Sequence, residues 1–205
     1  GHGGSSAQSA MDTTAAGDIW NNTLGLSGAV AAAAAGDNSL FYTLPAMMDG
    51  VAITASMSPG RAAQETHTSY GLVYTGVEGL TVKFGQGDSG APAAEIESTT
   101  MMASYAIGSF TVSASNTDAS KTGAADREVS SFQIAYTVSD NISLTYGEET
   151  FDLSDNAVDE ETSGFGASYT TGGMTLSAQT YKAEGVSLTA GAETEKWALT
   201  AAFAF

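Results

Sequence analysis

The sequence has no cysteine, only 3 prolines, and only 6 lysines and arginines against 23 aspartates and glutamates in 205 residues. Without cysteine there is no disulfide, no thiolate zinc site and no thiol nucleophile. The formal net charge of -17 argues against nucleic-acid binding, because attraction to phosphate requires a basic surface. No apolar run reaches the roughly 18–20 residues of a membrane-spanning helix. The 8 Phe, 8 Tyr and 2 Trp nevertheless argue against disorder.

Alternation of apolar and small polar residues is the dominant pattern, and it is typical of strands with one apolar face. The C-terminal segment 196–205 is the clearest example, with Trp197, Leu199, Phe203 and Phe205 on one face. Ten further segments alternate in the same way: 40–44, 51–55, 70–74, 80–84, 101–107, 110–115, 131–136, 142–147, 165–170 and 174–179. We therefore predict an all-β protein with eleven strands in residues 39–205.

The second face of these segments indicates their environment. It carries Ser, Thr, Gln, Gly and Ala, whereas a water-soluble sandwich would place Lys and Glu there. Connections alternate between short turns and longer segments at 58–65, 87–96, 117–127, 150–161 and 183–194. Most acidic residues fall in the long connections or before residue 39, and none is expected in the middle of a strand. The pattern predicts a transmembrane antiparallel up-and-down β-barrel with lipid outside and water inside.

Three stretches resemble the general porins of alphaproteobacteria. The end of the chain, Trp197-Ala-Leu-Thr-Ala-Ala-Phe-Ala-Phe205, resembles the C-terminal signal for outer-membrane insertion. The start, Gly1-His-Gly-Gly-Ser-Ser with Met11-Asp-Thr-Thr-Ala-Ala-Gly-Asp-Ile-Trp20, resembles the constriction loop that folds into the pore. The segments 138–147 and 168–176 are similar to hairpins of those porins.

The resemblance implies a sixteen-stranded barrel in the outer membrane of a Gram-negative bacterium. This chain would be its C-terminal portion, with residues 1–38 as the constriction loop in the lumen and residues 39–205 as transmembrane strands. Because there is no initiator Met and no signal peptide, we expect a mature product or a fragment. Eleven antiparallel strands cannot close a barrel by themselves.

Candidate pore residues come from the same resemblance. Asp12 and Asp18 would line the pore constriction, with hydroxyl contacts from Thr13 and Thr14; the alternative is that the aspartates are helix caps or turn residues. Lys83 shares a strand with Leu80, Val82 and Phe84 but falls on the opposite face. It would be either a charge that sets ion selectivity or a solvated wall residue.

An acidic stretch near residue 150 offers oxygen ligands for a cation such as Ca²⁺. Asp152, Asp155 and Asp159 are its candidate ligands, although no EF-hand spacing is present. The alternative is a solvated external loop. No other metal and no cofactor is expected.

The predicted function is passive diffusion of small hydrophilic solutes and ions through a homotrimeric outer-membrane porin. The acidic composition predicts a mild preference for cations. The expected partners are membrane lipid, further copies of the chain and small polar solutes. A surface-displayed structural or adhesive β-protein without a pore is the alternative. An enzyme is not expected: Gly87-Asp-Ser-Gly-Ala-Pro92 resembles a protease nucleophile segment, but the two histidines, His2 and His67, lack the sequence setting of a general base.

Overall fold

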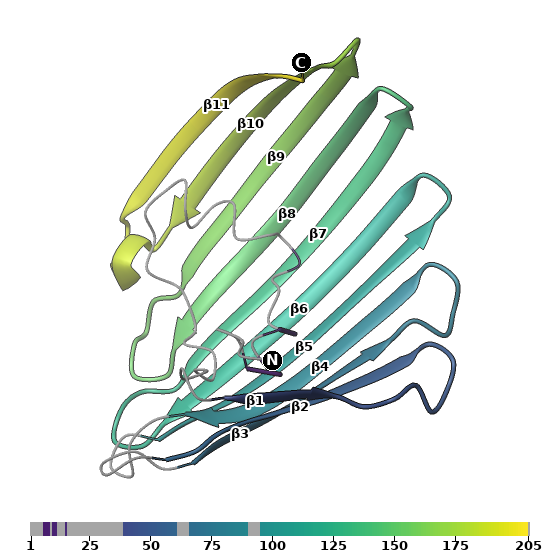
Figure 1. The fold of residues 1–205 in the computed structure, drawn as a ribbon. Helices are drawn as coiled ribbons and strands as arrows, with labels where there is room; N and C mark the ends of the chain where they lie inside the picture. Colours follow the sequence, from purple (N-terminus) through teal and green to yellow (C-terminus); the bar gives the residue numbers. More distant parts are fainter. Residues whose placement is uncertain are drawn as a thin grey trace.

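The computed structural model describes residues 6–8, 10, 11, 15, 39–60, 66–89 and 95–204. Within these residues, eleven strands pair in sequence order into one antiparallel sheet, as Figure 1 shows. The strands are β1 (Leu40–Thr43), β2 (Val51–Ser58), β3 (His67–Tyr74), β4 (Leu80–Ser89), β5 (Ile96–Ile107), β6 (Phe110–Lys121), β7 (Arg127–Ser139), β8 (Ile142–Leu153), β9 (Glu160–Thr171), β10 (Met174–Glu184) and β11 (Glu193–Phe203), with a 3-10 helix η1 (Val186–Leu188) before β11. The all-β fold class and the strand count are confirmed.

The sheet is strongly curved, and its long strands run obliquely across it (Figure 1). β1 and β11 lie at its two edges, each with one strand neighbour among the described residues. No helix in the described part of the chain is both long and apolar enough to cross a membrane.

Tight turns join the strands at one end of the sheet. Gly108 follows β5, and Gly172 and Gly173 separate β9 from β10; all three adopt positive φ, at 57°, 55° and 81°. Such angles favour glycine because it has no Cβ. The two-residue connections between β5 and β6, β7 and β8, and β9 and β10 therefore form one end of the sheet, as the sequence predicted.

At the opposite end, the strands extend further than the sequence predicted. The connections shrink to residues 122–126, 154–159 and 185–192, in place of 117–127, 150–161 and 183–194. The expectation that carboxylates avoid the middle of strands was wrong for Glu148 and Glu149, which lie inside β8. Backbone pairing needs no apolar side chains, so the ladder continues past the point where the apolar face ends.

Large apolar side chains lie on the convex face of the sheet, and no other element of the described structure covers this face. Trp197, Leu199 and Tyr70 are 75%, 69% and 59% exposed. The other face holds the buried side chains, and many of them are polar: Ser69, Ser98 and Thr100 are 2%, 0% and 0% exposed. A water-soluble sheet buries its apolar face. This inverted arrangement suits hydrocarbon outside and polar surroundings inside.

Aromatic side chains form two rows on the apolar face. The row near the tight turns contains Tyr105, Phe110, Tyr136, Tyr169 and Phe203, and the row further along contains Tyr70, Phe84, Phe132, Tyr146, Phe165 and Trp197. Aromatic rings concentrate at the interfaces of a bilayer, so these rows fit an outward face that lies in a membrane.

Replacing Tyr136 by alanine should test the row near the turns. The Tyr136 and Phe110 rings stack with centroids 4.5 Å apart and planes 23° apart. Such a pair contributes about 0.5–1.5 kcal/mol beyond burial. Because Tyr136→Ala removes the whole ring as well as the stacking, we expect it to lower the free energy of unfolding by at least about 1 kcal/mol. Tyr136→Phe keeps the stacking and should match the parent protein. Urea unfolding in lipid vesicles measures both, and equal losses in the two variants would contradict the stacking argument.

Candidate functional site

The inward, concave face of the sheet is lined by hydroxyl groups that hydrogen-bond across neighbouring strands. Alternation places Ser and Thr at inward positions, and the register brings them opposite one another, as in Ser56 with Ser69 and Ser143 with Ser168. Their oxygens approach to 2.6 Å and 2.7 Å. The pairs Thr100–Thr117, Ser115–Ser131 and Ser104–Ser113 repeat this at 3.0, 2.7 and 2.9 Å. A wall of small hydroxyl groups leaves space for water and offers it hydrogen bonds.

The described residues of the N-terminal segment lie against this face. The Ala7 amide donates to Ser56 Oγ at 2.9 Å, and the Gln8 side-chain amide donates to Thr100 Oγ1 at 2.9 Å. Further along, the Ala15 amide donates to Ser131 Oγ at 2.6 Å. Gln8 is 0% exposed. These partners come from β2, β5 and β7, so the described residues of the segment contact several strands on the inward face.

A backbone turn shapes the segment where it meets the wall. The Ala10 amide donates to the Ser6 carbonyl at 3.1 Å, and the Met11 amide donates to the Gln8 carbonyl at 2.8 Å. This turn satisfies two amides and two carbonyls internally, and the wall hydroxyls satisfy other backbone groups. Polar groups of the segment and of the wall thus satisfy each other's hydrogen-bonding capacity.

The structure places the predicted pore residues as follows. Lys83 lies in β4, on the inward face, with Val73 and Met102 as its register partners in the adjacent strands. Its role in selectivity stays a prediction. Asp12, Thr13, Thr14 and Asp18 fall outside the described residues, as does Phe205. Trp197, Leu199 and Phe203 lie exposed on the outward face of β11.

Charged residues of the strands are sorted between the two faces. Alternation and register assign Lys83, Lys121, Arg127 and Lys196 to the inward face, together with Glu149 and Glu160. The outward face carries Lys182 and most of the strand carboxylates: Asp88, Glu97, Asp118, Glu128, Glu148, Asp152, Glu161, Glu184, Glu193 and Glu195. The acidity of the described strands is therefore concentrated outside the wall of the lumen.

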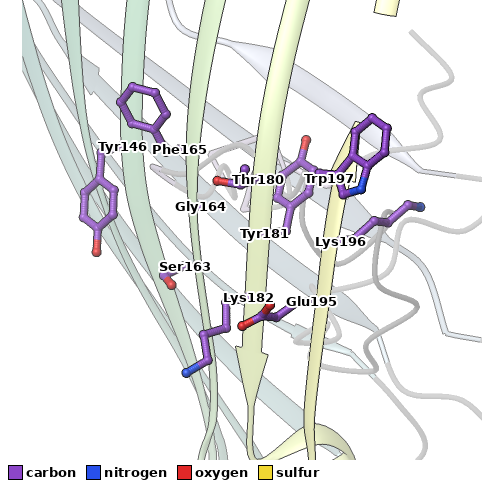
Figure 2. Close-up of a pocket in the computed structure, with 10 residues that line it drawn as sticks. All are labelled: Tyr146, Ser163, Gly164, Phe165, Thr180, Tyr181, Lys182, Glu195, Lys196 and Trp197. Atoms are coloured by element: carbon purple, nitrogen blue, oxygen red, sulfur yellow. The ribbon is translucent and has the colours of Figure 1, made fainter. Parts of the chain in front are cut away.

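A depression of about 560 Å³ lies on the outward face of β8–β11, shown in Figure 2. Its apolar part is formed by Tyr146, Phe165 and Trp197, which flank the small Thr180. Lys182, in an ion pair with Glu184, lies further toward the loop end. Rings followed by charges are typical of the boundary between hydrocarbon and head groups.

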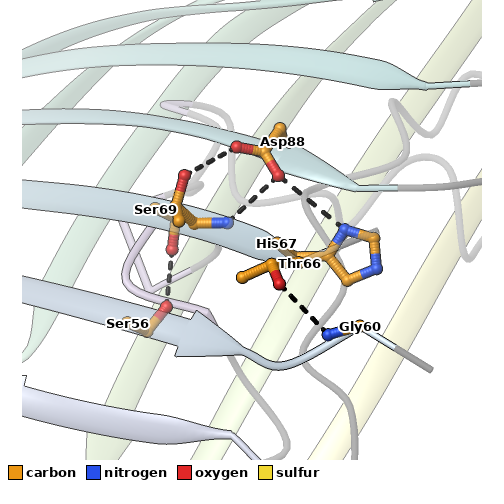
Figure 3. Close-up of polar contacts among 7 residues, drawn as sticks. Ser56, Gly60, Thr66, His67, Ser69 and Asp88 are labelled. Atoms are coloured by element: carbon orange, nitrogen blue, oxygen red, sulfur yellow. Dashed lines mark hydrogen bonds and ion pairs between the residues drawn. The ribbon is translucent and has the colours of Figure 1, made fainter. Parts of the chain in front are cut away.

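Asp88 connects the loop ends of β3 and β4 (Figure 3). The sequence analysis did not identify this contact. Its carboxylate accepts from the Thr68 amide at 3.0 Å and from Thr68 Oγ1 at 2.7 Å, and it lies 3.7 Å from His67 Nδ1. Backbone pairing of β3 with β4 begins only at Ser69. The carboxylate thus accepts a hydrogen bond from an amide that lies beyond the paired residues of β3 and β4. This contact holds the two strand ends together.

The candidate cation ligands do not form a centre in the described structure. Asp152 is the second-last residue of β8, whereas Asp155 and Asp159 lie in the connection to β9. Across residues 39–60, 66–89 and 95–204, no three His, Asp or Glu side chains are grouped so that they could hold a metal ion. Binding of Ca²⁺ at these aspartates stays a prediction.

Solved porins share this fold. The anion-selective porin from Comamonas acidovorans superposes with a TM-score of 0.60 at 12% identity, covering 74% of this chain and 50% of that one. A loop L8 deletion mutant of OmpT, an outer-membrane protein of Vibrio cholerae, gives 0.57 at 16% identity, covering 82% and 62%. A porin refined at 1.8 Å resolution gives 0.57 at 19% identity, covering 72% and 57%. The chain thus spans less than two thirds of each of these structures.

The sequence itself carries the family signal. No curated protein matches this chain closely enough to count as a relative. The family model described as Gram-negative porin matches residues 3–205, which is nearly the whole chain. An outward apolar band, an inward hydroxyl wall and porin-like topology agree with that match. The chain therefore belongs to the Gram-negative porin family, whose members are channels of the outer membrane.

Proposed function

We propose that this chain forms part of a water-filled pore through which small hydrophilic solutes diffuse passively. The observation that carries the proposal is the inversion of the two faces: large apolar side chains are exposed outward, and hydroxyl groups line the inward face. Such a sheet is stable with lipid on one side and water on the other. A secreted adhesive protein would expose this apolar band to water, which disfavours the alternative function.

Residues 1–38 form the constriction of the pore in this proposal. The docking of Ala7, Gln8 and Ala15 on the inward face supports a segment that occupies the lumen. Asp12, Thr13, Thr14 and Asp18 would then line the constriction, with Lys83 contributing from the wall.

The open sheet supports a longer barrel. We infer that the chain is the C-terminal portion of a sixteen-stranded barrel of the alphaproteobacterial type, because the unpaired edges of β1 and β11 would be unsatisfied in lipid. Trp197, Leu199, Phe203 and Phe205 would act as its insertion signal. The complete barrel would assemble as a homotrimer.

The ion preference depends on where the charges lie, not on the total charge of -17. Because most strand carboxylates point outward, the described wall of the lumen gives no support to the mild cation preference. That preference would depend on the acidic residues of the segment 1–38, among them Asp12 and Asp18.

Planar bilayer recordings test the function directly. Protein extracted from outer membranes in detergent, at its natural length, should produce stepwise increases in conductance that are linear with voltage at low potentials. Extraction in water without detergent, together with the absence of conductance steps, would reject the pore and favour the adhesive alternative.

A further inference from the structure

Two glycines create a notch in the inward wall at the place where the N-terminal segment docks. Gly71 of β3 and Gly85 of β4 are register partners in adjacent strands. Their flanking partners in the same row are Thr54 of β2 and Thr100 of β5. The wall therefore lacks side chains across two neighbouring strands and carries hydroxyl groups on both sides.

The segment fills this notch with its backbone. A Cβ atom at position 71 would lie 2.7 Å from the Ala7 carbonyl oxygen and 3.0 Å from Met11 Cγ. At position 85 it would lie 3.0 Å from the Gln8 carbonyl oxygen and 3.0 Å from Met11 Cβ. Since backbone atoms cannot rotate away, any larger residue at either position must displace the segment.

The hydrogen bonds around the notch hold the segment in one place. Ala7 is anchored to Ser56 beside Gly71, and the Gln8 side chain is anchored to Thr100 beside Gly85. Ala7 and Gln8 are both 0% exposed. Contact is therefore close enough to exclude water, which makes the fit sensitive to small changes in the wall.

We propose that Gly71 and Gly85 are positioning residues that set how far the N-terminal segment stands from the wall, and thereby set the open width of the pore. The inference rests on the proposed channel function. Glycine is unfavourable in strand interiors, and valine would strengthen the strand itself. At position 85 the three nearest atoms to a Cβ all belong to the segment, and at position 71 the Ala7 carbonyl oxygen shares the closest contact with Thr54 Oγ1, both at 2.7 Å. The close approach of the segment therefore favours glycine at both positions.

A single introduced cysteine reports the position of the segment, because the chain has none of its own. Ala7→Cys places a thiol at a buried position, and its reaction with a water-soluble maleimide should be slow in the folded protein. Adding Gly71→Val and Gly85→Val should accelerate labelling by about tenfold or more, as expected when overpacking opposes a fitted contact. Single-channel conductance should also differ from that of the Ala7→Cys parent.

Gly166→Val is the matched control. Gly166 is also an inward glycine, but a Cβ there would meet the side chain of Thr145, with Oγ1 at 2.7 Å, and none of the segment residues that the structure describes. Labelling of Ala7→Cys should stay slow in this variant, and heat-modifiable gel mobility should show that all variants are folded.

Equal labelling rates in the Gly71→Val/Gly85→Val variant and the Gly166→Val variant would contradict the proposal that Gly71 and Gly85 position the N-terminal segment. The channel proposal can fail separately. A parent protein that is labelled slowly but shows no conductance would support the docking of the segment on the wall and reject the pore.

Discussion

Ile134→Arg should strongly destabilise the protein in the membrane, whereas Gln133→Arg should be tolerated. Ile134 lies on the outward face of β7, between Phe132 and Tyr136. A cationic side chain facing lipid near the middle of the bilayer costs about 2–4 kcal/mol. Gln133 points to the opposite face, where its register partners are Ser113 and Gly147. There a guanidinium group would enter the aqueous lumen.

The two variants differ by one position in the same strand, so they have nearly the same depth in the membrane. Urea unfolding in vesicles should show a loss of about 2–4 kcal/mol for Ile134→Arg and less than about 1 kcal/mol for Gln133→Arg. If Ile134→Arg does not fold at all, the fraction recovered in the outer membrane replaces the unfolding measurement. Similar behaviour of both variants would contradict the assignment of lipid and lumen to the two faces.

The fold was predictable because its signal is local. Alternation along β7, with Phe132 and Ile134 against Ser131 and Gln133, assigns each side chain to a face without knowledge of any other strand. In a barrel of neighbouring strands, the sequence order is also the spatial order, so few topological choices remain.

Strand ends were less predictable, because the apolar pattern stops before the backbone ladder does. After Tyr146, the outward positions of β8 become Glu148, Thr150 and Asp152, and the sequence pattern indicates a loop. The ladder nevertheless continues, with Glu148 opposite Ser163 of β9. Hydropathy marks the limit of the lipid band, whereas the end of the strand depends on backbone pairing.

The place where the N-terminal segment docks depends on the register between neighbouring strands, which cannot be derived from the sequence alone. Gly71 and Gly85 are 14 positions apart and become neighbours only through the pairing of β3 with β4. Gln8 reaches Thr100 across a separation of 92 residues. The sequence contained one usable signal, since glycines at inward positions of two consecutive strands indicate a close approach of other backbone.

Reversing the charge of Lys83 should shift the selectivity of the pore toward cations. Lys83 lies on the inward face of β4, two residues from Gly85, so it stands beside the place where Gln8 and Met11 of the N-terminal segment contact the wall. Lys83→Glu changes the local charge by two units. At about 8 Å in water, each unit contributes about 0.5 kcal/mol. A cation is thus favoured and an anion disfavoured by about 1 kcal/mol each, so the cation-to-anion permeability ratio should rise on the order of ten- to thirtyfold at low salt and less at high salt.

Lys182→Glu makes the same change in charge on the outward face of β10, where the lysine pairs with Glu184. Reversal potentials measured across a salt gradient should move for Lys83→Glu and stay near the parent value for Lys182→Glu, because the wall and the surrounding ions screen the outward charge. Two equal shifts would show that selectivity follows the total charge of the protein. A shift confined to Lys83→Glu would show that ions pass along the inward face, since only a charge beside their path acts on them at short range.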